Sequence, residues 1–554
     1  MRGDVASPGF DRSRLPVWAV AWLVCLFALT ITIRVFDPTG WVGSDDASYY
    51  SAAEHVLTGQ PIQRLHHHYA RAAIVLPVAA SVAIFGHNAE AVALPMLAAS
   101  VLCVMLVVLM GRTLFGWWEG LFAGTVVAVL PYFRILSTTA FPDVHVCLWT
   151  TAAMLLAVQA RRRLSAMLWL SCGFALGLAV SAKVFAIAVA PAIALIGWRG
   201  STPPTRGGAT FRSAALVLIG LASFQLLEGL FYLWAAGDFF FSLHATLAVQ
   251  ASVPGMTTDS VATAMTPAQF VVDRLMMLMR PSTSGWGWIG VLFWPTLLAA
   301  GIVKKSARPL VVWAMSTFVL VAFVPLNFSS GAQPYPIFHG RHILPACIPF
   351  ALCLAWIARS VLERAIAAPW SLRAWPIAAA CVVVVALGDI RSLNGFRDRA
   401  TRRVGDAIRE LVANPSWDDS GEIFMTPSTY WRFRVLFPDS VRSRLRVATA
   451  ESSPDWWKKA CPDIVQRWAP LPPPGKGYLI ATPAQLLGPG DQRDYGVGLP
   501  PEYLIEWQRT PALTTLVRSP DKRISRSQDG SPHSDAILVL VGPAESQPRL
   551  AGTP

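Results

Sequence analysis

Long apolar runs separated by short polar connections occupy most of the first 390 residues of this 554-residue chain. A helix that spans a bilayer needs about 20 mostly apolar residues. The pattern therefore predicts a polytopic α-helical membrane protein with about 11 transmembrane helices, in which the boundary at 182/183 is the least clearly marked. The predicted spans are 15–36, 88–111, 118–134, 142–160, 165–182, 183–198, 213–235, 284–303, 309–326, 342–358 and 374–390.

One further apolar run, 72–86, is short enough either to span the membrane or to lie along its surface. Cytoplasmic loops of membrane proteins carry an excess of Lys and Arg. If 72–86 does not span, every compact basic cluster faces the cytoplasm, so we expect a cytoplasmic N-terminus, a first outer loop at 37–87 and an extracytoplasmic C-terminus. These clusters are Arg2, Arg12 and Arg14; Arg112; Arg161–Arg163; Arg199, Arg206 and Arg212; Lys304, Lys305 and Arg308; and Arg359, Arg364 and Arg373.

The composition changes after residue 390, where the long apolar runs end and Pro, Asp and Arg become frequent. Short apolar stretches at 422–426, 477–482 and 536–542 are typical of strands, and 400–412 is typical of an amphipathic helix. We therefore predict two parts. Residues 1–390 form a transmembrane catalytic module, and residues 391–554 form a soluble α/β domain on the extracytoplasmic face.

The overall composition supports a membrane protein and narrows its partners. Apolar residues make up 54% of the chain and charged residues only 14%, against about 25% charge in a typical soluble domain. A net charge of +13 in such a protein indicates cytoplasmic loop charge and attraction to anionic lipids, so we expect membrane lipids and no nucleic acid as partners. The sequence contains no P-loop, GxGxxG, HExxH or GxSxG motif, which argues against nucleotide-driven transport and common hydrolase designs.

Two adjacent carboxylates, Asp45 and Asp46, follow the first predicted helix within the segment 43–50. Carboxylates at an apolar boundary are costly to desolvate, and their mutual repulsion raises at least one pKa. A carboxylate held there can take a proton from an incoming hydroxyl or amine. The alternative is that Ser44 or Asp45 caps a following helix at 47–57, and the two roles can coexist.

Around these acids the chain resembles the first outer loop of family 39 glycosyltransferases, which include protein O-mannosyltransferases and the lipid A aminoarabinose transferase. The resemblance extends in order over residues 15–365. The sequence departs from the family in having Asp46 where Glu is usual, and 69–73 in place of a basic-Pro-Pro segment. The matching motifs are Asp45-Asp46-Ala47-x-x-Tyr50-x-x-Ala53, Gly59, Leu76-Pro77, Phe85-Gly86, Glu90, Leu114-Phe115-Gly116, Pro142-Asp143, Gly173-x-x-x-Gly177-Leu178, Lys183 and Gly340-Arg341-His342-x-Leu344-Pro345.

The resemblance implies a GT-C fold and transfer of a sugar from a polyprenyl-phosphate donor to a glycan, lipid or protein acceptor outside the cytoplasm, with inversion. Asp45 occupies the family's position for the general base, and Asp46 would support it or orient the acceptor. Leaving phosphate needs cationic donors, and arginine can contact it with two parallel hydrogen bonds. The expected phosphate-binding residues are Arg71, Lys183 and Arg341, and the expected substrate-binding residues are Asp143, Tyr49 and His342. The expected location is a bacterial inner membrane.

Each candidate also has a structural interpretation. Lys183 can extend from a helix end to the headgroups, Arg341 can anchor the chain at the interface, Arg71 can orient an interfacial helix, and Asp143 after Pro142 can cap a helix. His66–His68 are adjacent, whereas zinc sites usually draw on dispersed ligands, so headgroup or acceptor contact is the preferred interpretation. No cofactor is assigned, and a divalent metal is left open.

Three other functions are compatible with many apolar helices. A transporter or flippase would carry ionisable groups near the bilayer midplane and show an inverted repeat, whereas here the charges lie at the helix ends. A glycan polymerase or ligase would share the carrier and sidedness but not the Asp-Asp loop. A membrane scaffold would not need acids and cations gathered in one region. The transferase is therefore the preferred prediction.

Overall fold

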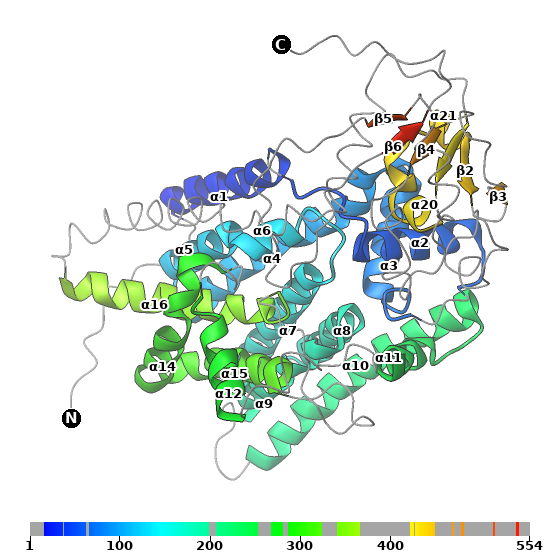
Figure 1. Ribbon diagram of the computed structural model, residues 1–554. Coiled ribbons are helices and arrows are strands. Elements are labelled where there is room, and N and C mark those ends of the chain that lie inside the picture. Colours follow the sequence, from blue (N-terminus) through cyan, green and yellow to red (C-terminus); the bar gives the residue numbers. More distant parts are fainter. Residues whose placement is uncertain are drawn as a thin grey trace, which may run out of the picture.

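The computed structural model is mostly helical and describes the greater part of the chain up to residue 365, with shorter pieces beyond (Figure 1). The predicted span 374–390 and the predicted helix 400–412 lie outside the described residues. The described ranges are 16–36, 38–62, 66–198, 206–252, 267–280, 286–323, 341–365, 422–425, 427–448, 468–469, 478–480, 513–515 and 539–541.

Six helical segments in the described part of the chain are long and apolar enough to cross a membrane, and each coincides with a predicted span. They lie in α1 (Val17–Val35), α4 (Ala89–Leu114), α7 (Asp143–Arg163), α10 (Arg206–Ala236), α15 (Arg308–Phe323) and α16 (Cys347–Ala365). Five shorter apolar helical segments accompany them: Ala72–Phe85, Trp117–Val129, Ala166–Ala182, Val184–Trp198 and Trp288–Val303.

Several predicted spans are interrupted. The run 118–134 breaks at Pro131 into α5 (Trp117–Val129) and α6 (Pro131–Leu136), because proline has no N–H to continue the helical hydrogen bonds. The run 183–198 is a 3-10 turn η1 (Val184–Val189) followed by α9 (Ala190–Trp198), and 284–303 is η3 (Gly287–Leu292) followed by α14 (Phe293–Val303). The predicted boundary at 182/183 is confirmed, since α8 (Ala166–Ala182) ends there.

The segment 38–86 forms two short helices, α2 (Asp45–Thr58) and α3 (Ala72–Phe85). Fourteen residues of α3 extend about 21 Å, short of the ~30 Å hydrocarbon thickness, which favours the non-spanning interpretation of 72–86. Two further helices, α11 (Phe241–Ser252) and α12 (Pro267–Met277), were not predicted.

The helices α8 and α10 pack closely through small residues. A Cβ atom at Gly173 of α8 would overlap the carbonyl oxygen of Val217 on α10. Glycine at this position lets the two backbones approach each other, as at small-residue contacts between membrane helices.

The C-terminal part contributes a four-stranded parallel sheet with the order β3-β2-β1-β4 and an antiparallel pair β5–β6. The strands are β1 (Ile423–Met425), β2 (Leu445–Ala448), β3 (Trp468–Ala469), β4 (Tyr478–Ile480), β5 (Leu513–Thr515) and β6 (Val539–Val541). The predicted strands at 422–426, 477–482 and 536–542 correspond to β1, β4 and β6. Between β1 and β2 lie α20 (Pro427–Phe433), η7 (Arg434–Leu436) and α21 (Asp439–Arg442).

Two hydrophobic cores lie within the part of the chain that the structure describes. The larger one lies among the membrane helices, from α1 and α4 to α15 and α16. The second joins α2, α3 and the start of α4 to α10, α11, β1, β2 and α20. The sheet accordingly lies against α2 and α3 at one end of the helical body (Figure 1), so the acidic loop is held between the two parts.

Candidate functional site

The two adjacent acids lie in different environments. Asp46 is fully buried, and its carboxylate accepts four backbone N–H groups: Val42 at 2.6 Å, Gly43 at 3.2 Å, Ser44 at 2.6 Å and Ala47 at 3.0 Å. Burial raises the pKa of Asp46, and these N–H donors oppose the shift. Asp46 therefore closes the turn at the N-terminus of α2.

This arrangement corrects the predicted cap. Ser44 occupies the N-cap of α2 but makes no side-chain capping bond, and the helix begins at Asp45, two residues earlier than predicted. The four donors are held by Asp46, which reaches back over the turn. Gly43 supports the turn through its positive φ of 67°, which L side chains rarely adopt.

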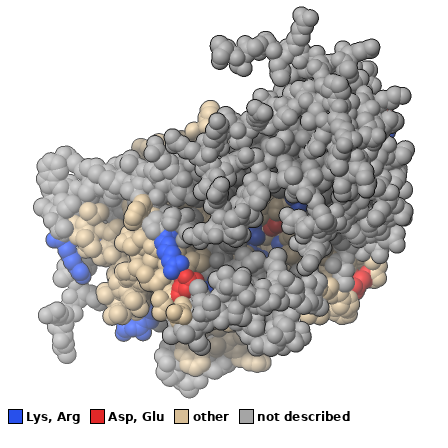
Figure 2. Space-filling model, viewed as in Figure 1, with Lys and Arg blue, Asp and Glu red and all other residues tan. Residues whose placement is uncertain are grey.

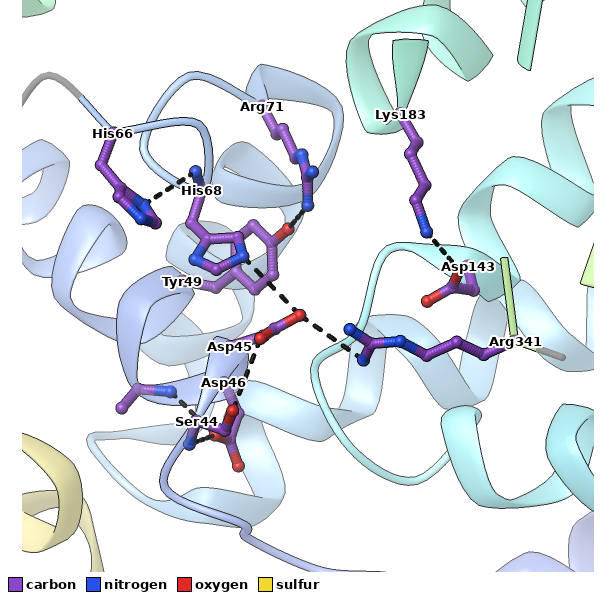
Figure 3. Close-up of polar contacts among 11 residues, drawn as sticks. Ser44, Asp45, Asp46, Tyr49, His66, His68, Arg71, Asp143, Lys183 and Arg341 are labelled. Atoms are coloured by element: carbon purple, nitrogen blue, oxygen red, sulfur yellow. Dashed lines mark hydrogen bonds and ion pairs between the residues drawn. The ribbon is translucent and has the colours of Figure 1, made fainter. Parts of the chain in front are cut away.

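Asp45 is consequently directed away from the turn, toward the side chains of His68 and Arg341 (Figure 3). Its carboxylate oxygen lies 3.6 Å from His68 Nε2 and 3.8 Å from Arg341 Nη1, and 17% of its side chain is exposed. Both separations are longer than a charge-assisted hydrogen bond. Asp45 is thus close to cations yet accessible to another molecule.

Arg71 lies on the same side of α2. Its Nη1 donates a hydrogen bond to the hydroxyl of Tyr49, and its guanidinium carbon lies 6.0 Å from the Tyr49 ring centre. Tyr49 is four residues after Asp45, so both project from one face of the helix. Burial raises the pKa of Tyr49, which keeps this hydroxyl protonated at neutral pH.

Lys183 and Asp143 lie across from Asp45 and Arg71, on the other side of the site (Figure 3). Lys183 Nζ lies 2.8 Å from Asp143 Oδ1, and side-chain exposure is 12% for Lys183 and 2% for Asp143. Lys183 follows the last residue of α8, and Asp143 is the first residue of α7. Lys183 is therefore turned inward toward Asp143.

Arg341 and His342 precede η5 (Leu344–Ala346). The guanidinium carbon of Arg341 lies 5.1 Å from the Phe141 ring centre, which directs its side chain toward Asp45. His342 is buried and lines a small cavity together with Asp143, Lys183, Trp313 and Thr317. All eight predicted site residues, Asp45, Asp46, Tyr49, Arg71, Asp143, Lys183, Arg341 and His342, therefore lie around one region.

The contacts on the face of α2 that carries Tyr50 and Glu54 were not predicted from the sequence. Arg434 of η7 is buried, pairs with Glu54 and lies 4.9 Å from the Tyr50 ring centre. The hydroxyl of Tyr50 also lies 3.0 Å from His87 Nδ1. The i, i+4 spacing of Tyr50 and Glu54 marks a second face of α2, but 380 residues separate Glu54 from Arg434.

The three consecutive histidines do not form a metal site by themselves. In the described part of the chain, no group of three or more His, Cys, Asp or Glu residues has metal-binding geometry. His68 instead faces Asp45, and His66 Nδ1 lies 3.4 Å from the backbone nitrogen of His68.

A family model and several solved structures are similar to this chain. Residues 76–226 match the dolichyl-phosphate-mannose-protein mannosyltransferase family. Among solved structures, ArnT from Cupriavidus metallidurans bound to undecaprenyl phosphate is 14% identical and covers 97% of this chain and 99% of its own, with a TM-score of 0.56. The chain has the GT-C fold. The predicted resemblance to this glycosyltransferase group is thereby confirmed.

Two other solved structures were also matched. Apo ArnT from the same organism is 12% identical over 96% of this chain and 99% of its own, with a TM-score of 0.57. An apo oligosaccharyltransferase from Archaeoglobus fulgidus is 14% identical over 77% of this chain and 64% of its own, with a TM-score of only 0.42. No individual curated protein matches the chain.

Proposed function

We propose that this protein is an integral membrane glycosyltransferase that moves a sugar from a polyprenyl-phosphate carrier to an acceptor on the extracytoplasmic face of a bacterial inner membrane. The observation that carries the proposal is the position of Asp45, which is partly exposed and lies near His68 and Arg341, with Arg71 and Lys183 close by; these four residues come from three separate segments (Figure 3). A base next to several cations suits a reaction that removes a proton and releases phosphate.

The chemistry follows from these charges. Asp45 accepts the proton of an acceptor hydroxyl or amine, and the acceptor atom attacks the anomeric carbon from the side opposite the phosphate. The bond between that carbon and the phosphate oxygen breaks, so the sugar's configuration inverts. The phosphate leaves with one additional negative charge.

Cations at the site stabilise that developing charge. Arg71, Lys183 and Arg341 project toward the space beside Asp45 (Figure 3), and preorganised donors act most strongly where charge appears in the transition state. Arg71 and Arg341 both lie close enough to Lys183 for their charges to influence it. The three cations thus suit a phosphate held between α3, α8 and η5.

Two of the remaining candidates are assigned to the substrate and two to positioning. Asp143 and His342 line the small cavity beside Lys183, and their polar atoms suit sugar hydroxyls. Tyr49 holds Arg71 in place through its hydroxyl. Asp46, whose carboxylate is occupied by backbone N–H groups, acts through the position of Asp45 and not as a second base.

The test uses cells that lack the gene and express either the wild type or the Asp45→Asn variant. Mass spectrometry of envelope glycolipids, glycans and glycoproteins is expected to show an added sugar mass with the wild type. Asp45→Asn should reduce that signal by about 10²–10⁴, the usual contribution of a general base, at equal protein abundance.

The matched control is Asp273→Asn, which removes a carboxylate paired with Arg280 at 2.8 Å on an exposed surface and should leave the signal unchanged. A wild-type signal from Asp45→Asn would remove the proposed base. Movement of an intact lipid-linked glycan without a new glycosidic bond would instead favour transport.

A further inference from the structure

The main chain on either side of Arg71 is held by side chains from three other helices. Arg71 precedes α3, and its neighbours contribute two carbonyl groups and one N–H group to these contacts. The hydroxyl of Tyr232 donates to the carbonyl oxygen of Tyr69 at 2.9 Å, and the hydroxyl of Ser242 donates to that of Ala70 at 3.0 Å.

An N–H group after Arg71 is held in a similar way. Ser181 Oγ accepts the N–H of Ala73 at 3.1 Å. Ser181 also donates its own proton to Glu228. A hydroxyl from α8, held by a carboxylate from α10, thus satisfies an N–H group that the first turn of α3 leaves without a partner in the helix.

Burial of the Glu228 carboxylate would be costly in free energy without hydrogen bonds of this kind. Its side chain is buried, with only 4% exposed, on an otherwise apolar helix, and a buried carboxylate requires hydrogen bonds to compensate for lost hydration. The N-terminus of α3 supplies N–H donors and the positive end of the helix dipole. Glu228 gains its compensation from the hydroxyl of Ser181, which also accepts the N–H of Ala73 at the start of α3.

We propose that Glu228, Ser181, Tyr232 and Ser242 are positioning residues that hold the backbone at 69–73 and thereby aim the Arg71 guanidinium at the phosphate of the lipid donor. The proposal rests on the proposed function, since it takes Arg71 as a phosphate ligand. Arg71 has a long side chain, and its hydrogen bond to Tyr49 fixes only the distal end. The four side chains fix the other end.

The test measures binding of undecaprenyl phosphate to the full-length protein in nanodiscs by native mass spectrometry. Arg71→Ala is expected to weaken binding by about tenfold, the value of one charge-assisted hydrogen bond. Glu228→Leu should weaken it by about three- to tenfold, whereas Glu228→Gln, which keeps an acceptor oxygen, should retain most of the affinity.

The decisive comparison is the double variant Arg71→Ala with Glu228→Leu. If Glu228 acts through Arg71, the double variant binds no more weakly than Arg71→Ala alone, because residues acting through one contact are not additive. Independent losses that multiply would overturn the positioning role. Tyr232→Phe and Ser242→Ala each remove one hydrogen bond and provide the same comparison if Glu228→Leu does not fold.

The two proposals fail in different ways. If Arg71→Ala binds undecaprenyl phosphate as the wild type does, both the phosphate role of Arg71 and the positioning role are wrong. If Arg71→Ala weakens binding but Glu228→Leu, Tyr232→Phe and Ser242→Ala do not, only the positioning role is wrong.

Discussion

Charged side chains at the two ends of the helical body are arranged differently. At the end where α5 and α16 meet, Arg359 contacts Glu119 at 2.8 Å and Glu363 at 2.6 Å. At the other end, Asp45 lies 3.6 Å from His68 and 3.8 Å from Arg341. The first group satisfies its charges at hydrogen-bond distance, whereas the second leaves room between them.

This difference separates structural charges from candidate functional ones. Figure 2 shows basic side chains among uncharged ones at the end occupied by α14 and α16 in Figure 1. There Glu119 is almost completely buried and uses Arg359 as its counterion, so the pair compensates a desolvation cost. Around Asp45, the cations Arg71 and Arg341 face this partly exposed acid and the Asp143–Lys183 pair. That excess of positive charge suits an anionic substrate.

The largest expected difference between the two ends is in sugar transfer, when one arginine at each end of the helical body is replaced by alanine. Arg341→Ala should reduce transfer at limiting donor by about 10²–10³, the usual cost of removing a donor that stabilises transition-state charge, with little change in melting temperature. Arg359→Ala should keep transfer within about twofold and lower the melting temperature by roughly 5 °C, because Glu119 loses its counterion.

Transfer is measured with the acceptor identified by mass spectrometry, and melting by the fluorescence of the purified protein. Equal losses of transfer in both variants, at equal stability, would show that the two ends do not differ in function. Glu363→Gln is a mild control, since that carboxylate is 53% exposed and exposed ion pairs contribute little.

A second, smaller effect concerns the Asp143–Lys183 pair, which resembles the Glu119–Arg359 pair in its distance of 2.8 Å. Lys183→Gln should weaken undecaprenyl phosphate binding by about tenfold. Asp143→Asn removes a negative charge and frees Lys183, so it should strengthen binding by roughly threefold while it lowers transfer.

The two variants are therefore expected to change undecaprenyl phosphate binding in opposite directions: Lys183→Gln weakens it and Asp143→Asn strengthens it. If both variants weaken binding equally, or if neither changes it, the pair is structural like its counterpart at the other end. Thr317→Val, next to the pair in the lining of the small cavity, is the matched control for local packing and should leave undecaprenyl phosphate binding within about twofold.

The apolar runs predicted most of the fold because burial in a bilayer depends on length and hydrophobicity, which are local properties. The six long apolar helices coincide with predicted spans. The breaks did not follow from hydropathy, since the run 118–134 is apolar on both sides of Pro131. The helices α11 and α12 were missed because neither forms a long apolar run.

The site residues could be named from the sequence, but their partners could not. Asp45 and Asp46 are adjacent and chemically identical, and only the folded turn places Asp46 on four N–H groups while it directs Asp45 outward. The hydrogen bonds that hold the backbone on either side of Arg71 come from α8, α10 and α11. Such long-range hydrogen bonds have no signature in local spacing.

The smallest expected effect concerns the turn at residues 42–47, here called the acidic turn, at the point where it contacts the C-terminal part. A Cβ at Gly43 would lie 3.0 Å from a ring carbon of Phe433, and Gly43 has a φ of 67°. Gly59, at the end of α2, has a φ of 65° but nothing within 4 Å of the same position. Glycine-to-alanine changes at the two sites thus share the cost of a left-handed backbone conformation, about 1–2 kcal/mol. They differ because only the new methyl group at position 43 would contact Phe433.

Gly43→Ala should lower the melting temperature by a few degrees more than Gly59→Ala and reduce transfer by about threefold, since the contact displaces the turn that directs Asp45. Gly59→Ala should leave transfer unchanged. Adding Phe433→Leu to Gly43→Ala should restore part of the lost transfer, because the ring no longer meets the new methyl group. If the two single variants reduce stability and transfer equally, contact with the C-terminal part does not position the acidic turn, and the charges around Asp45 are set by the helical body alone.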